Sequence, residues 1–471
     1  MTVLTLQKDF KAFVLNGELV VGVIGPDGKV NPIAGYTQDA NGNPVGLLNY
    51  DGTTLKFPTA CKATATLCGD STMAYGDNIG AGGSGIGETS QSHVAWAGGL
   101  LRGTPFRIIA NRAVAGTLID SGSNSLLLVQ LPLALVDASD ILWIRSGINH
   151  LNPSIDASTP TVAQIVDKFK RLLDLAASAK PCVIVDSLNP LNGAATSPSG
   201  AYPRHTDIPL VNAQLQALCA TYRNVIYNDT YDAIAADQVG NAIASMVSSV
   251  DGIHQQTSGA YAMGVRSAAN IYPRLTLAAG YRVAKTVALP DFTGTGGISS
   301  PGSGTVTGTI SANMNVINAA GTSNVTCSVV GHSLQLVIDN SASASAVATI
   351  QVKLASATAY LGTFANADVV TAYGRFQITN GGGLNRSNLT FQLNPSGTVV
   401  NVDALSKSTQ ENGTPPTVFP SANYDVTLNT RPWALNASPT SINIAATLEV
   451  KAGQIVTAVL SGWGLNALTA I

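Results

Sequence analysis

The spacing of hydrophobic and polar residues divides the chain into parts with different patterns. Residues 1–62 contain short apolar runs such as AFVLNG and LVVGVIG, separated by turn sequences such as GPDG and NYDGTT. Short runs bounded by glycine, proline and asparagine are typical of strands joined as hairpins. We therefore expect residues 1–62 to form a β-rich N-terminal segment.

Residues 63–286 combine strand-like and helix-like patterns. Five short apolar runs recur there, namely ATATLCG, FRIIAN, DILWIRSG, PCVIVDS and NVIYND, while residues 161–179 and 207–222 place apolar residues at helical spacing. Strands that alternate with helices usually become parallel strands joined by crossovers, so we expect a layered α/β domain. The longest apolar run, SLLLVQLPLALV at residues 125–136, predicts a buried helix that is too short to span a membrane.

The helical pattern stops after residue 286. Residues 287–304 are rich in glycine, serine and proline and predict a linker. Residues 305–471 contain short runs of valine, threonine, isoleucine and leucine, such as SLQLVID and ATIQVKL, separated by turn residues. This pattern predicts a C-terminal all-β, sandwich-like domain.

Composition and charge exclude several classes of protein. Charged residues make up 11% of the 471 residues and hydrophobic residues 45%, which is not the composition of a disordered chain. The formal net charge of −2 supplies no basic surface for phosphates, so we expect no nucleic-acid partner. No apolar run is long enough for a membrane span. Charged residues interrupt the first apolar stretches, so we also expect no signal peptide and synthesis in the cytoplasm.

Four polar blocks follow strand ends or precede a helix in the α/β region. Ser71 in GDS, Gly116 in NRAVAG and Asn149 in GIN follow the first three predicted strands, and Asp251 and His254 in DGIH precede a helical segment. Asp and Ser are good helix N-caps, so GDS alone also fits an ordinary helix start. The order of all four blocks is the stronger signal, because the carboxyl ends of parallel strands gather ligands at one edge of a sheet.

These blocks resemble the four motif blocks of the SGNH/GDSL hydrolase family over about residues 64–279. The resemblance implies a flavodoxin-like three-layer α/β fold and a Ser-His-Asp triad made of Ser71, His254 and Asp251. Many members of that family have aspartate after the asparagine of the third block, whereas this chain has His150. The hydrogen bonding around Asn149 is therefore left open by the sequence.

The chemistry of ester hydrolysis suits these residue types. A serine hydroxyl needs a base to remove its proton, and an imidazole held by a carboxylate can take that proton and return it to the leaving alcohol. His254 is the candidate base and Asp251 its orienting acid, while the backbone N–H groups of Ser71 and Gly116 and the side-chain amide of Asn149 would form an oxyanion hole.

Other candidate chemistry is weaker. The histidines lack metal-ligand spacing, so we expect neither a metal nor a cofactor. The glycine-rich stretch from Asn78 to Ser90 lacks the ending of a phosphate-binding P-loop, and we expect a loop at the rim of the site. The five cysteines lack paired spacing, so we expect free thiols. His205 lies in a predicted loop, most simply at the surface.

The resemblance and the β-rich C-terminal region lead to one main functional hypothesis. We expect a carboxylic ester hydrolase that removes small acyl groups, specifically O-acetyl groups, from a capsular or lipopolysaccharide-type polysaccharide. The chain also looks like a bacteriophage tail-spike or tail-fibre protein, which implies a virion component acting at the bacterial surface as a homo-oligomer, such as a trimer. The alternatives are a lipase or thioesterase of the same family and a catalytically inert receptor-binding protein.

The placement of the candidate site assigns different roles to the two large regions. Every candidate catalytic residue precedes residue 279. We therefore expect residues 305–471 to act in carbohydrate or receptor binding or in oligomerisation, and residues 1–303 to retain activity on a small acetyl ester.

Overall fold

The computed structural model describes the chain in several stretches, which divide into two compact units, Met1–Lys62 and Ala63–Ile471. The described residues are 61–77, 86–100, 106–192, 196–197, 200–271, 281–288, 292–356, 358–359, 363–365, 368–394, 400–406, 419–435 and 440–470, together with the five N-terminal strands. Across these stretches, no helix combines the length and apolar character that crossing a membrane requires.

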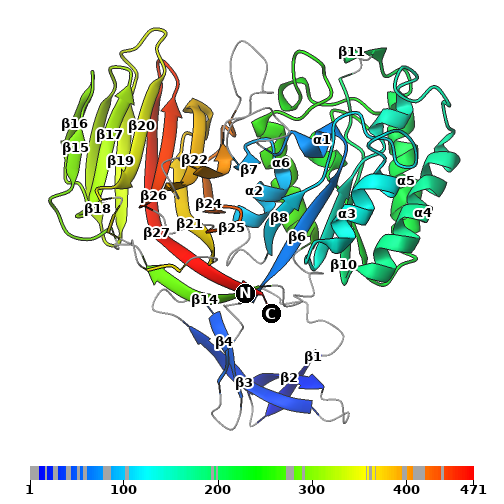
Figure 1. Ribbon diagram of the computed structural model, residues 1–471, viewed down its shortest axis with the longest axis horizontal. Helices are drawn as coiled ribbons and strands as arrows, with labels where there is room; N and C mark the ends of the chain where they lie inside the picture. Colours follow the sequence, from blue (N-terminus) through cyan, green and yellow to red (C-terminus); the bar gives the residue numbers. More distant parts are fainter. Residues whose placement is uncertain are drawn as a thin grey trace. The chain divides into compact units, whose positions relative to one another are not determined.

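The first unit is an antiparallel meander in which each strand pairs with the next along the chain (Figure 1). Its strands are β1 (Phe10–Leu15), β2 (Glu18–Ile24), β3 (Val30–Gln38), β4 (Pro44–Asn49) and β5 (Thr54–Lys56). The regular alternation of apolar runs and turn sequences in this segment accounts for the hairpin connections.

The second unit contains a parallel sheet with helices. Its strands are β6 (Cys61–Gly69), β8 (Phe106–Asn111), β9 (Ile141–Arg145), β10 (Cys182–Asp186) and β13 (Val225–Asn228). They lie side by side in the order β8-β6-β9-β10-β13, which is 2-1-3-4-5 along the chain. The direction of winding reverses between β6 and β9, and such a reversal leaves a crevice at the carboxyl ends of the strands where ligands bind.

Helices cover both faces of this sheet (Figure 1). On one face, α3 (Leu131–Val136), α4 (Val162–Ala179) and α5 (Ile208–Cys219) share a hydrophobic cluster with β9 and β10. On the other face, α2 (His93–Leu100) and α6 (Thr257–Ile271) contribute to a second cluster, with Trp143 of β9. The helix α4 begins where the sequence predicts it, because Thr161 and Gln164 form a reciprocal capping box.

The apolar run at residues 125–136 is only partly buried, because five of its twelve residues are exposed, so the expectation of a buried helix is wrong for those five. It forms a single π-helical turn, Leu126–Gln130, followed by α3. Leu128, Leu133 and Val136 are 64%, 47% and 81% exposed, whereas Leu126 and Leu131 are buried. A helix in an outer layer contacts the sheet along one stripe only, so its other face meets solvent whatever its composition.

Two β-sheets form the C-terminal part of the second unit. One contains β15 (Ile298–Ser300), β17 (Met314–Ala320), β20 (Ala348–Leu354), β26 (Ser441–Val450), β22 (Leu384–Asn394) and β23 (Val400–Ser406), in that order. The other contains β16 (Thr305–Gly308), β18 (Asn324–Val330), β19 (Ser333–Asp339), β27 (Ile455–Ala470), β21 (Val369–Thr379), β24 (Tyr424–Asn429) and β25 (Trp433–Ala434). Buried residues of both sheets belong to one hydrophobic cluster.

Backbone pairing joins the C-terminal strands to the α/β region. The strand β14 (Tyr281–Ala288) pairs antiparallel with β27, and β7 (Ile86–Thr89) pairs in parallel with β23. Residues 287–304, which we expected to be a linker, therefore contain the end of β14 and all of β15. Pairing in this way satisfies backbone groups at strand edges, so the two regions share hydrogen bonds as well as side-chain contacts.

Candidate active site

The GDS sequence forms a sharp turn from β6 into the single helical turn α1 (Ser71–Ala74). Asp70 caps this turn, because its Oδ1 accepts hydrogen bonds from the backbone N of Thr72 at 3.0 Å and from the Thr72 hydroxyl at 2.6 Å. Burial raises the pKa of Asp70, and the hydrogen bonds from Thr72 oppose that rise. The acid of GDS is therefore a helix cap, which leaves the neighbouring serine as the residue available for chemistry.

The glycine of GDS is required by close backbone approach. Gly69 has φ of +153°, and a Cβ at this position would lie 1.9 Å from the carbonyl oxygen of Arg145. The side chain of Gln130 binds both backbone groups of Gly69, since the Gly69 N–H donates to its Oε1 at 2.8 Å and its Nε2 donates to the Gly69 carbonyl at 3.0 Å. The backbone immediately before Ser71 is thus fixed on two sides.

The structure brings Ser71, His254 and Asp251 together in one hydrogen-bonded chain. The Ser71 hydroxyl lies 2.8 Å from His254 Nε2, and His254 Nδ1 lies 2.7 Å from Asp251 Oδ2. The carboxylate accepts the proton of Nδ1, so Nε2 is the basic nitrogen that faces the serine hydroxyl. Ser71 is 8% exposed, and the side chains of His254 and Asp251 are 12% and 17% exposed, so the group reaches solvent at one side.

The DGIH loop is shaped by its own acid. Asp251 Oδ1 accepts hydrogen bonds from the backbone N–H groups of Ile253 and His254, at 2.8 and 3.1 Å, while Oδ2 holds the imidazole. Burial alone would raise the pKa of Asp251, but its hydrogen bond and electrostatic interaction with His254 and the two backbone donors hold that pKa below its ordinary value. The ring of Tyr75 packs against the imidazole at a centroid distance of 4.4 Å.

Gln91 and Gln255 connect the loop that carries His254 to the turn that carries Ser71 by hydrogen bonds. Gln255 Nε2 donates to the carbonyl of Thr72 at 2.8 Å and to the carbonyl of Gln91 at 3.0 Å, and Gln91 Nε2 donates back to the Gln255 carbonyl at 2.9 Å. Because Gln255 follows His254 and Thr72 follows Ser71, this bridge fixes the distance between the two reacting side chains.

Gly116 and Asn149, the two remaining oxyanion candidates, are linked through Thr117. Asn149 lies in a 3₁₀ turn after β9, where its Nδ2 donates to the carbonyl of Thr117 at 3.0 Å and its Oδ1 accepts from the Tyr202 hydroxyl at 3.1 Å. Gly116 precedes Thr117, has φ of +77° and is exposed. Among the described residues, no hydrogen bond joins Gly116 or Asn149 directly to Ser71. Their N–H groups would therefore act on the negative charge that develops on a bound ester.

His150, which follows Asn149, is a structural residue. Its Nε2 accepts a hydrogen bond from the backbone N–H of Ile119 at 3.1 Å, and its Nδ1 donates to Asp156 at 2.5 Å. Burial lowers the pKa of His150, although the bond and charge of Asp156 oppose the shift. The neutral ring therefore holds the loop of Gly116 against the turn of Asn149.

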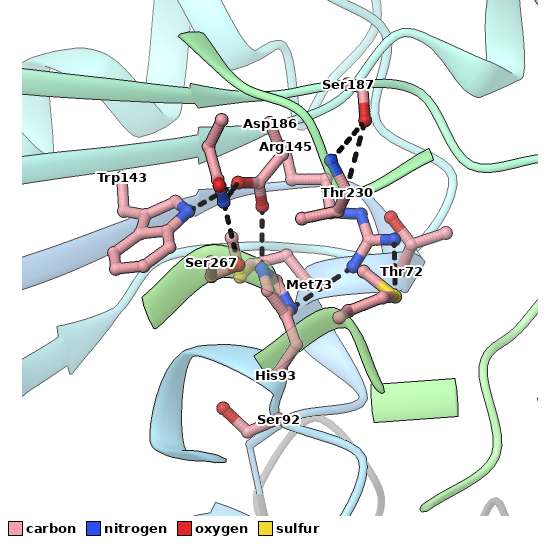
Figure 2. Close-up of polar contacts among 12 residues, drawn as sticks. Thr72, Met73, Ser92, His93, Trp143, Arg145, Asp186, Ser187, Thr230 and Ser267 are labelled. Atoms are coloured by element: carbon pink, nitrogen blue, oxygen red, sulfur yellow. Dashed lines mark hydrogen bonds and ion pairs between the residues drawn. The ribbon is translucent and has the colours of Figure 1, made fainter. Parts of the chain in front are cut away.

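A second buried histidine, His93, belongs to the network of polar contacts drawn in Figure 2. Asp186, at the end of β10, accepts hydrogen bonds from His93 Nε2 at 2.7 Å, from Trp143 Nε1 at 2.8 Å and from Asn228 Nδ2 at 2.6 Å. Arg145 donates to His93 Nδ1 at 3.2 Å. This network joins the ends of β9, β10 and β13 to α2, and therefore supports the sheet edge that carries the candidate triad.

Several of these supporting residues were missed in the sequence. Gln130 interrupts an apolar run and Gln255 follows the DGIH motif directly, so both offered a local signal. Tyr202 offered none, because it reaches Asn149 from 53 residues away. His93 begins α2, and its partner Asp186 lies 93 residues further along the chain, so no local pattern indicated that pair.

Other predicted features have mixed outcomes. Residues 78–85 of the glycine-rich stretch lie outside the described residues, and residues 86–89 form β7. His205, which we expected in a surface loop, begins a 3₁₀ turn and is half-buried, and its Nδ1 lies 3.3 Å from the carbonyl of Tyr202. In the parts of the chain that the structure describes, no three acidic, histidine or cysteine side chains gather as a metal site would require. Among the cysteines whose side chains the structure describes, Cys68, Cys182, Cys219 and Cys327 are free thiols and are buried.

Comparison with known proteins gives only partial similarities. No family model matches the chain, and no curated protein matches it. An acetylxylan esterase from Geobacillus stearothermophilus is similar at 15% identity and a TM-score of 0.33, over 46% of this chain and 97% of that chain. An α/β hydrolase enzyme from the metagenome of Lake Arreo, Spain, is similar at 14% identity and a TM-score of 0.34, over 45% of this chain and 95% of that chain.

Proposed function

We propose that the protein is a serine ester hydrolase in which Ser71 is the nucleophile, His254 the general base and Asp251 the residue that orients the base. The observation that carries this proposal is the continuous hydrogen-bonded chain from the serine hydroxyl through both ring nitrogens to the carboxylate. A neutral serine becomes an effective nucleophile when such a base takes its proton during attack.

In the first half of the reaction, Ser71 Oγ attacks the ester carbonyl carbon while its proton moves to His254 Nε2. The carbonyl oxygen gains a negative charge, which the backbone N–H groups of Ser71 and Gly116 and the amide of Asn149 would receive. Collapse of this intermediate breaks the bond to the leaving oxygen, and His254 returns the proton to it. An alcohol leaves, and the acyl group stays on Ser71.

In the second half, water replaces the alcohol. His254 removes a proton from the water as its oxygen attacks the acyl carbon, the same donors receive the oxyanion, and the bond to Ser71 Oγ breaks as the proton returns to that oxygen. The products are a carboxylic acid and the free serine. Asp251 stays ionised throughout and stabilises the imidazolium that forms twice in the cycle.

For the fold and substrate we propose the finer assignments made from the sequence. The strand order 2-1-3-4-5 supports a flavodoxin-like, SGNH-type domain. The resemblance to that family and the β-rich C-terminal region support O-acetyl groups of a polysaccharide as the substrate. The assignment to a phage tail and the homotrimer stay predictions from the sequence. Light scattering of the full chain tests the oligomeric state.

A panel of p-nitrophenyl esters tests the proposal. We expect the acetate to be hydrolysed faster than the butyrate and octanoate, and the Ser71→Ala variant to show no turnover above buffer. Faster hydrolysis of the longer esters would favour the lipase or thioesterase alternative. A wild type that hydrolyses none of the esters above buffer would contradict the proposal and favour an inert receptor-binding protein. Acetate release from acetylated bacterial polysaccharide then tests the substrate class.

A further inference from the structure

Tyr75 connects the turn of the candidate nucleophile to the candidate base. It caps the carboxyl end of α1, the helical turn that begins at Ser71, and its backbone N–H donates to the Ser71 carbonyl at 3.0 Å. Its own carbonyl accepts a hydrogen bond from the Thr89 hydroxyl at 2.7 Å. These two bonds fix the backbone from which the ring reaches His254, so the turn that carries Ser71 also determines where the ring lies.

The rings of Tyr75 and His254 are in close contact. Their centroids are 4.4 Å apart, and their planes are inclined by 40°. Aromatic pairs in proteins usually have centroids about 4.5 to 7 Å apart, and an edge-on pair has planes close to a right angle. At this shorter distance and smaller inclination, the imidazole lies over the face of the tyrosine ring, which is the negative side of its quadrupole.

The phenol of Tyr75 stays neutral beside the triad. Burial raises its pKa, and the negative charge of Asp251 raises that pKa further, so the hydroxyl keeps its proton at physiological pH. Tyr75 therefore supplies neither a base nor a full negative charge to the site. What it presents to the imidazole is the face of an uncharged aromatic ring.

The ring of His254 becomes a cation in each half of the proposed reaction. Asp251 accepts the hydrogen bond of Nδ1 and so meets this charge at one edge of the imidazole. The side chain of His254 is only 12% exposed, so little water reaches the rest of the ring. An aromatic face within about 6 Å attracts a cation, and the attraction is stronger where water is excluded.

We propose that the ring of Tyr75 stabilises the imidazolium form of His254 by a cation–π interaction and thereby lowers the barrier to attack by Ser71. This inference rests on the proposed function. Because Tyr75 acts through His254, it is a positioning residue and not a catalytic one. The charge that it stabilises is present in the transition state and absent from the ground state, so the interaction should increase kcat and have little effect on KM.

Steady-state kinetics on the acetyl ester tests the role of the ring. Tyr75→Leu removes the aromatic face but keeps an apolar side chain, and kcat should fall by about 3- to 30-fold with KM little changed. Tyr75→Phe removes only the hydroxyl and should recover most of the lost kcat. Tyr222→Leu removes another half-buried tyrosine, whose hydroxyl binds Asp174 of α4, and is the control that should keep the wild-type kcat.

A series of fluorinated rings separates the cation–π interaction from simple packing. Phenylalanine analogues with one, two and three ring fluorines at position 75 keep the shape of the ring while they withdraw electrons from its face. We expect the logarithm of kcat to decrease with each fluorine, because the attraction depends on the negative charge of the face. The Tm of every protein in the series should stay the same, which shows that packing is preserved.

The outcomes distinguish this inference from the proposed function. A kcat that is the same across the fluorinated series would show that the ring only packs, and an equal loss in Tyr75→Phe and Tyr75→Leu would assign the effect to the hydroxyl; either result overturns the inference. If the wild type still hydrolyses the ester while Ser71→Ala does not, the proposed function survives such a result. A wild type without ester hydrolysis would remove both.

Discussion

At the scale of single residues, Ser71 and His254 form the contact on which the proposed chemistry depends. Ser71→Ala and His254→Ala should each lower kcat/KM for a small acetyl ester by about four orders of magnitude or more, because the members of a triad act as one unit. Ser154→Ala, at an exposed loop position, is the matched control and should behave as wild type. Retained turnover in a folded Ser71→Ala protein would remove this serine from the reaction.

Asn149 tests the oxyanion assignment separately. Asn149→Ala should reduce kcat by about 100- to 1000-fold and change KM much less, because an oxyanion donor acts mainly on charge present in the transition state. Steady-state kinetics on the acetyl ester measures both parameters. A large rise in KM with little change in kcat would instead place Asn149 in ground-state substrate binding.

Tyr202 should contribute through Asn149. Tyr202→Phe removes the hydroxyl that fixes the amide oxygen, so we expect kcat to fall by about 2- to 10-fold, the range of one neutral hydrogen bond. In an Asn149→Ala background the same change should have no further effect on kcat. An undiminished effect in that double variant would mean that Tyr202 acts independently of the amide.

At the scale of elements, the glutamine bridge links two loops that arrive from opposite ends of the α/β region. Gln255→Met removes both donated bonds while keeping the side-chain volume, so the distance between Ser71 and His254 should become less well fixed. We expect kcat to fall by about 10-fold with KM little changed, because positioning acts on the rate of attack. The adjacent Gln256→Met, which loses only a bond to Val247, is the control.

The buried histidines make the fold sensitive to mild acid. Burial lowers the pKa of His93 below its ordinary value of 6.5, and the positive charge of Arg145 adds to this, while Asp186 opposes it. Below pH 6.5 the unfolded chain therefore binds more protons than the folded chain, and the free energy of unfolding must decrease as the pH falls through the lowered pKa.

Urea unfolding at pH 7.5 and pH 5.5 measures this dependence, about one unit on either side of the reference pKa of histidine. We expect lower stability at pH 5.5 for the wild type and a smaller difference between the two pH values for His93→Gln. Asp251, whose pKa is also lowered, does not affect this comparison, since its contribution to the free energy of unfolding is lost only as the pH falls below 3.8. An equal pH response in His93→Gln would contradict the assignment to His93.

The elements also show what the sequence could and could not predict. The five strands of the parallel sheet and the order of the polar blocks depend on local pattern, and the sequence located them. Gln130 is separated from Gly69 by 61 positions in the sequence, and no local pattern indicates which backbone groups its side chain will bind. The exposure of Leu133 and the strand pairing after residue 286 likewise depend on which surface packs opposite, which periodicity alone does not specify.

At the scale of the whole molecule, the C-terminal strands are part of the support of α2. Trp96 packs edge-on against Phe419 and Tyr424, and its Nε1 donates to the Ser90 carbonyl at 2.9 Å. The ion pairs of Arg431 with Asp77 and Glu88 also join the C-terminal part to the α/β region. The sequence predicted that residues 1–303 keep activity on a small ester, whereas these contacts argue that the shortened chain loses its fold.

We therefore expect a chain cut after Ser303 to aggregate or to unfold at a much lower temperature, because Trp96 and the edge of β14 lose their partners. Residues 57–471, which lack the five strands of the first compact unit, are the control and should retain both the fold and ester hydrolysis. Circular dichroism and the acetyl ester assay check both proteins. A folded, active 1–303 fragment would restore the expectation from the sequence.

The pairing of β14 with β27 also determines when this protein can complete its fold during synthesis. Tyr281 pairs with Ala470 at one end of this ladder. The strand β14 therefore cannot form this pairing until residues up to Ala470 have been synthesised. At about 5 to 20 residues per second, the ribosome needs on the order of tens of seconds to make the intervening chain. Throughout that interval the nascent α/β region presents an unpaired strand edge, so chaperone protection during translation should matter more to the yield of this protein than its final stability does.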